Sequence, residues 1–193
     1  MSNLPANPLQ GMLKRAAQSL PATTGRVAAQ QERIDRRRGQ AVMLADISAS
    51  MGMPATGGQR KIDVLREAVA AAVRQSAARL FVFSGQSREV RDVPEPEGNT
   101  NLAAALDAVR ALDPGVTLVI SDGQPDNAAA ALAAARKFRG AIDVLYIGPE
   151  SDAAALAFMR ALAKAGNGDV RVHDIARLGN SQQLLGHIAG LLT

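Results

Sequence analysis

The chain has 193 residues, a formal net charge of +4, no cysteine and only 3% aromatic residues. The lack of cysteine excludes disulfides, thiolate metal sites and cysteine nucleophiles. The length is typical of one domain with a short extension, and the scarcity of aromatics predicts a core built from Ala, Val, Leu and Ile.

The positive charge is concentrated at the start of the chain. Residues 1–40 carry seven basic and two acidic residues, whereas residues 41–193 carry 15 basic and 16 acidic residues. We therefore predict a basic N-terminal extension over 1–40 and a nearly neutral domain over 41–193. The arginine cluster at 33–38 is of a kind that attracts nucleic-acid phosphates. We favour a solvated helix or linker, because no aromatic residue interleaves with the charges and the adjoining domain is not basic.

The sequence has no feature that targets it to a membrane. The N-terminus lacks the apolar segment of a signal peptide, and no run approaches the roughly 18 apolar residues of a transmembrane helix. We therefore expect a cytoplasmic protein.

After residue 40, strand and helix patterns alternate. Apolar runs predict strands at 41–45, 80–83, 116–121, 141–147 and 170–173. Helical spacing predicts helices at 61–79, 128–139 and 152–164, with two more marked by Leu102 to Val109 and Leu184 to Leu191. Residues 88–93 alternate in polarity and precede two prolines, as is typical of an edge strand. This order predicts a doubly wound α/β fold: a mostly parallel sheet with one antiparallel edge strand and helices on both faces.

The most informative motif follows the first strand. Asp46-Ile-Ser-Ala-Ser50 places one carboxylate and the hydroxyls of Ser48 and Ser50 where an apolar run opens into a loop. Alternation points Asp46 and Ser48 the same way, and a curling loop can add Ser50. Magnesium prefers about six oxygen ligands and usually keeps some waters, so a few further groups would complete a site.

Two later positions supply such groups. Thr100 follows a glycine-containing loop, and Asp122 ends the apolar strand at 116–121. Both precede predicted helices. Because polar groups at the carboxyl ends of neighbouring parallel strands converge on one crevice, we expect the three segments to meet.

In type and order, these five residues resemble the metal-ion-dependent adhesion site of the von Willebrand factor A (vWA) domain family, and the resemblance covers roughly residues 40–193. It implies a Rossmann-like vWA fold in which Ser48, Ser50 and Thr100 bind Mg²⁺ or Mn²⁺ directly. Asp46 and Asp122 would act largely through water or as outer partners, and a protein partner would supply a carboxylate. Asn99, where the family often has glycine, is a small departure.

Each of these residues also has an ordinary structural interpretation. Asp46 and the two serines could stabilise a turn, Thr100 could begin a helix and Asp122 could form an Asp-Gly turn. Asp126 is better explained as a helix-start residue than as a ligand. We assign no role to His173 and His187, which stand alone in the sequence.

Two classes of function fit the motif. The resemblance implies a non-catalytic, Mg²⁺-dependent interaction module, similar to intracellular bacterial vWA proteins that work beside AAA+ ATPases of the MoxR type. The chain has no P-loop, so any ATPase would be a separate chain. The alternative is a Mg²⁺-dependent phosphohydrolase of the haloacid dehalogenase type. That chemistry needs an acid/base aspartate two residues after the nucleophile, where this chain has Ser48.

Overall fold

The computed structural model describes residues 24–55, 58–175 and 181–192. The chain divides into two compact units between Asp35 and Arg36. In the first unit the structure describes most of helix α2 (Thr24–Arg36). Of the predicted extension over 1–40, residues 1–23 lie outside the described residues. The second unit, residues 36–193, carries all five of the predicted ligands.

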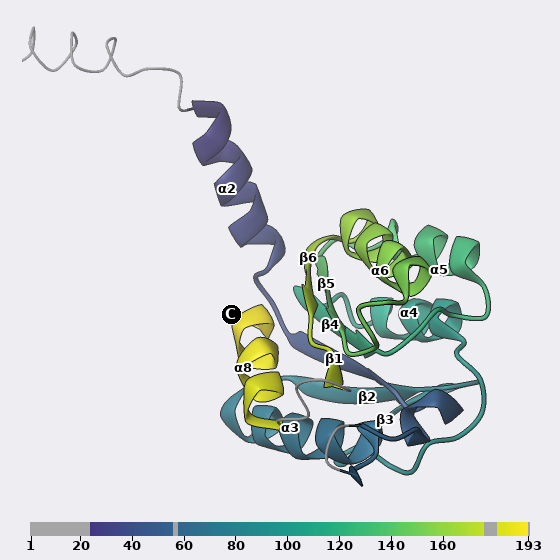
Figure 1. The fold of residues 1–193 in the computed structure, drawn as a ribbon. Helices are drawn as coiled ribbons and strands as arrows, with labels where there is room; N and C mark the ends of the chain where they lie inside the picture. Colours follow the sequence, from purple (N-terminus) through teal and green to yellow (C-terminus); the bar gives the residue numbers. More distant parts are fainter. Residues whose placement is uncertain (1–23, 56–57, 176–180, 193) are drawn as a thin grey trace, which may run out of the picture. The chain divides into compact units, whose positions relative to one another are not determined.

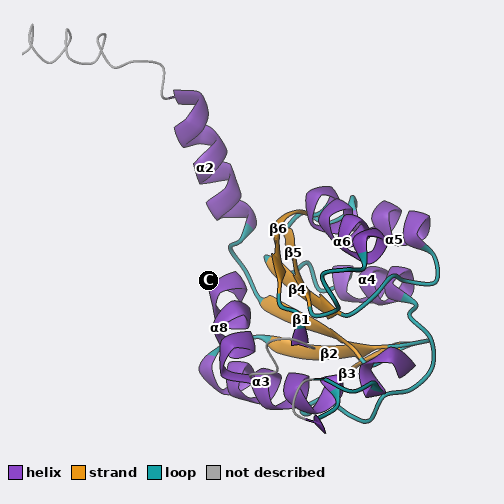
Figure 2. Cartoon of the chain, viewed as in Figure 1, coloured by secondary structure: helices purple, strands orange, loops and turns teal. Residues whose placement is uncertain are grey.

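The second unit contains one six-stranded sheet, drawn in orange in Figure 2, with the order β3-β2-β1-β4-β5-β6. The strands are β1 (Ala41–Asp46), β2 (Arg79–Phe83), β3 (Ser87–Glu89), β4 (Val116–Ser121), β5 (Ala141–Tyr146) and β6 (Asn167–Val172). Five strands run parallel and β3 pairs antiparallel with β2 at one edge. The predicted fold class is therefore confirmed.

Helices cover both faces of the sheet (Figure 1). They are α3 (Lys61–Gln75), α4 (Leu102–Arg110), α5 (Ala128–Ala135), α6 (Ala153–Ala165) and α8 (Ser181–Leu192). Helices α3 and α8 pack on one face, whereas α4, α5 and α6 pack on the other. Along β1 the side chains alternate between the faces: Met43 joins the first core layer and Val42 the second. The aliphatic core that the composition predicts is present.

Several elements differ in length from their predicted spans. Helix α3 ends at Gln75 because Ser76 has an extended backbone and its hydroxyl donates to the Ala72 carbonyl at 2.9 Å. Helix α5 ends at Ala135, where tighter turns lead the chain back toward β5. Strand β3 is only three residues long. Apolar periodicity sets which face is buried, but local backbone hydrogen bonds decide where each element stops.

Among the described residues, no helix is both long and apolar enough to cross a membrane.

Candidate metal centre

The two predicted aspartates lie at the carboxyl ends of adjacent strands. Asp46 is the last residue of β1, and Asp122 directly follows β4, which pairs in parallel with β1. Strand β1 lies between β2 and β4, so the sheet order changes direction here. This switch point is where open α/β sheets form a crevice for ligands.

The carboxylate of Asp46 forms the floor of the site. The side chain is fully buried; Oδ1 accepts the backbone N–H of Ser48 at 2.7 Å and Oδ2 accepts the hydroxyl of Ser121 at 2.6 Å. Burial raises the pKa of Asp46 to about 6, although the hydrogen bonds from Ser121 and Ser48 oppose the rise. The charge of Asp122 raises this pKa further. The fold therefore holds a carboxylate whose charge is poorly solvated, which favours a nearby cation.

The two serines connect Asp46 to Asp122. The bond from the Ser48 amide to Asp46 is an Asx turn, which bends the chain directly after β1. The short 3-10 helix η1 (Ala49–Gly52) follows, and its buried Met51 anchors the loop in the core. In this loop the hydroxyl oxygens of Ser48 and Ser50 lie 3.1 Å apart, and Ser50 donates to Oδ1 of Asp122 at 2.8 Å.

This donor set fits a hard, octahedral cation. Neighbouring oxygens around Mg²⁺ at 2.0 to 2.1 Å lie about 2.9 Å apart, close to the 3.1 Å between the two serine hydroxyls. A hydroxyl that donates its proton to Asp122 keeps lone pairs for a metal. Ser48 and Asp122 are buried whereas Ser50 is exposed, so the site has an opening to solvent. No three His, Cys, Asp or Glu side chains cluster within the described residues, and a cation here would depend on hydroxyl oxygens.

Thr100 lies at the same edge but is less closely joined to the others. Its backbone N–H donates to Oδ1 of Asp126 at 3.2 Å, and its carbonyl accepts the N–H of Asp126 at 3.0 Å. The preceding Gly98 accepts the N–H of Ala49 at 3.2 Å, which ties this loop to the serine loop. Within the described residues, no hydrogen bond joins the Thr100 hydroxyl to Asp46, Ser48, Ser50 or Asp122. The structure thus links four of the predicted ligands directly and places the fifth on an adjoining loop.

The structure of the Thr100 loop corrects one expectation. Asp126 does not begin α5; Asn127 caps that helix by accepting the Ala130 N–H at 2.9 Å. The carboxylate of Asp126 instead contacts the side-chain amide of Asn99 and the backbone of Thr100. The left-handed backbone conformation occurs at Gly98, with φ of +67°, and not at Asn99. Asn99 therefore serves this loop through its amide.

Sequence reasoning missed two other residues of the site. Ser121 directly follows the apolar residues 118–120, and its hydroxyl at the end of this run was an available signal for the Asp46 contact. The ammonium of Lys61 lies 2.6 Å from Oδ2 of Asp122. Nothing in the local sequence indicates that contact, because 60 residues separate the partners.

The two histidines pair with one another away from this network. His173 is buried, and its ring meets that of His187 edge to face, with 5.2 Å between centroids. Burial lowers the pKa of both imidazoles, so the neutral forms are favoured. This contact is one of packing.

Comparison with known proteins gives distant likeness in fold alone. No protein-family model matches the chain, and no curated protein matches it. Among solved structures, the crystal structure of the Deinococcus radiodurans RO (RSR) protein is 16% identical, with a TM-score of 0.49. That match covers 80% of this chain but only 35% of the other, so the chain spans about a third of that protein's length. A likeness of this degree carries no functional inference.

Proposed function

We propose that this protein is a non-catalytic interaction module of the vWA type. It would hold Mg²⁺, or Mn²⁺, between Ser48, Ser50 and Thr100, with Asp46 and Asp122 balancing the charge. The observation that carries the proposal is the continuous hydrogen-bonded chain from Asp46 through the two serines to Asp122, at the switch point of the sheet. Hydroxyl and carboxylate oxygens are ligands that both cations accept.

The partner would contribute a carboxylate. A metal held mainly by neutral hydroxyls and waters keeps most of its charge, and it favours a hard anionic oxygen over water. Ser50 is exposed, so such an oxygen can approach from solvent. By analogy with the intracellular members of the family, the partner would be a cytoplasmic protein, for example an AAA+ ATPase of the MoxR type.

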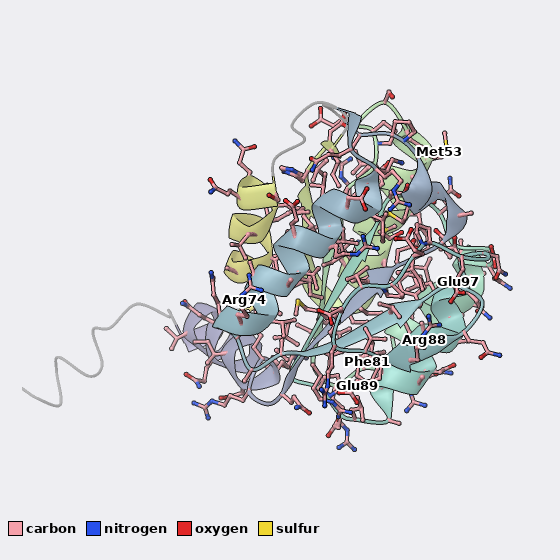
Figure 3. All side chains as sticks on the ribbon, turned by 90° about the horizontal axis from the view of Figure 1, so that it is seen from below. Met53, Arg74, Phe81, Arg88, Glu89 and Glu97 are labelled. Atoms are coloured by element: carbon pink, nitrogen blue, oxygen red, sulfur yellow. The ribbon has the colours of Figure 1, made fainter. Side chains whose placement is uncertain are left out.

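The rim of the site supports a role in recognition. Glu95 pairs with Arg60 at 2.7 Å and with Arg66 at 3.0 Å, while Arg88 pairs with Glu97 at 2.9 Å. Arg88 and Glu97 are labelled at the surface in Figure 3, as is Met53, which is 58% exposed. Exposed ion pairs add little stability. Here they would fix the loop that leads to Thr100, leaving an apolar side chain available to a partner.

Calorimetric titration with MgCl₂ tests the metal site. The double variant Asp46→Ala with Ser48→Ala should bind Mg²⁺ about 10-fold to 100-fold more weakly than wild type. Removing even a residue that only supports a metal ligand typically weakens binding by about this factor. Asp107→Ala, which removes a carboxylate that is 48% exposed on α4, is the control and should bind like wild type. If wild type does not bind Mg²⁺, the proposal is wrong.

A pull-down from lysate, with Mg²⁺ or with EDTA, tests recruitment. A partner retained by wild type only with Mg²⁺, and lost by the double variant, is the expected result. Conversely, metal binding with no Mg²⁺-dependent partner would contradict the recruitment role and leave the cation structural.

A further inference from the structure

A lysine lies against the candidate metal centre in an almost dry environment. Lys61 is the first residue of α3, and its ammonium is 2.6 Å from Oδ2 of Asp122. The two side chains are only 14% and 2% exposed. Exposed pairs are weakened by water and salt, whereas a buried pair is screened much less.

Helix stability does not explain a lysine at this position. The N-terminus of a helix carries a partial positive charge, so a cation in the first turn is unfavourable there. The preceding residue, Arg60, is already held by Asp63 at 2.9 Å and by Glu95. Asp122 is therefore the group that compensates Lys61.

The same carboxylate also contacts the serine loop. While Oδ2 meets Lys61, Oδ1 accepts the hydroxyl of Ser50 at 2.8 Å. Both oxygens of Asp122 are thus engaged, one by a cation and the other by a serine of the proposed metal site. A divalent ion bound at the serines would be separated from the ammonium only by the carboxylate of Asp122. The two positive charges would therefore repel each other.

We propose that Lys61 is an internal cation that competes with Mg²⁺ for the charge of Asp122. The inference rests on the proposed function and adds its regulation: the ammonium neutralises Asp122 in the metal-free protein and loses this partner when the metal binds. A lysine suits this exchange, because its charge sits at the end of a flexible stem. The backbone N–H of Lys61 also donates to the Met53 carbonyl at 3.0 Å, so the exchange takes place next to the loop that carries the exposed Met53.

Calorimetry on Lys61→Met tests the competition. The variant should bind Mg²⁺ about 5-fold to 100-fold more tightly than wild type, the usual range of coupling between two interacting sites. Lys137→Met removes the same charge from an exposed position on the chain and should bind like wild type. Equal or weaker binding by a folded Lys61→Met would overturn the inference while leaving the metal site intact. If neither protein binds Mg²⁺, the proposed function is wrong and the inference with it.

A second measurement uses only the wild-type protein. Lysines are acetylated with an amine-reactive ester, with and without Mg²⁺, and each site is quantified by peptide mass spectrometry. Mg²⁺ should increase the labelling of Lys61 several-fold relative to that of Lys137, because the ammonium loses its carboxylate. Unchanged or reduced labelling of Lys61 at a Mg²⁺ concentration that saturates the site would overturn the inference, whether or not Lys61→Met folds.

Discussion

At Asp46, the proposed metal site conflicts with the stability of the fold. Its carboxylate is fully buried, and burial raises its pKa from 3.8 to about 6. Without metal, the carboxyl group of Asp46 therefore holds its proton more tightly in the folded protein than in the unfolded chain. Below pH 4 both states are protonated; as the pH rises through 4 to 6, the unfolded chain ionises first and the folded state loses stability relative to it.

We predict that Asp46→Asn stabilises the metal-free protein at neutral pH. The amide has the same shape: its oxygen can accept the Ser48 N–H, and its nitrogen can donate to the Ser121 hydroxyl. The gain should be about 1 to 3 kcal/mol at pH 7.5 and should shrink to a small fraction of that near pH 4. Urea titrations in EDTA at both pH values measure it, and a variant that is less stable than wild type at pH 7.5 would contradict the argument. The variant should also bind Mg²⁺ more weakly.

At the scale of elements, β5 carries a buried carboxylate whose counter-charge comes from the segment before β1. Asp143 is fully buried, and the guanidinium of Arg37 binds both of its oxygens, at 3.0 and 2.9 Å. Asp143 Oδ1 also accepts the N–H of Asp169 on β6 at 2.7 Å. The sheet is thus bound to a residue of the arginine cluster at 33–38. The charge pattern predicts that this cluster is solvated, but Arg37 is only 22% exposed, so the prediction is wrong for this residue.

We predict that Arg37→Ala lowers the free energy of unfolding by about 3 to 5 kcal/mol, because it leaves a buried carboxylate without its counter-charge. Adding Asp143→Asn should recover part of this loss, since the unpaired charge is then gone. Chemical denaturation of the two single variants and the double variant gives the coupling energy. Arg139→Ala, which removes an arginine that is 87% exposed, is the control and should change stability by less than about 0.5 kcal/mol. A loss for Arg37→Ala no larger than the control's would refute the role given to the pair.

At the scale of the whole molecule, the sequence predicts the layers of the fold but not its cross-connections. The alternation of apolar runs with helical spacing was sufficient to predict a mostly parallel sheet covered by helices. The polar residues after β1 and β4 were sufficient to locate the candidate site. Lys61 with Asp122, and Arg37 with Asp143, could not be predicted. Each pair depends on which strands become neighbours, and charged residues at turns or helix starts have many possible partners.

The boundary of the folded unit follows from the same contacts. Besides Arg37, which binds Asp143, this segment contributes the Gln40 carbonyl, which accepts the Gly115 N–H at 3.1 Å. The compact unit begins at Arg36. Residues 36–40 therefore contribute contacts to the sheet that a chain starting at residue 41 would lack.

We predict that a fragment of residues 36–193 unfolds at the same urea concentration as the full chain. A fragment of residues 41–193 should be less stable by at least the 3 to 5 kcal/mol expected for loss of the arginine alone, because it also loses the Gln40 contact. Arg37→Ala placed in the longer fragment is the matched control, and it should account for most of the difference. If the two fragments are equally stable, the charge on Asp143 is compensated without Arg37, and residues 36–40 make no energetic contribution to the domain.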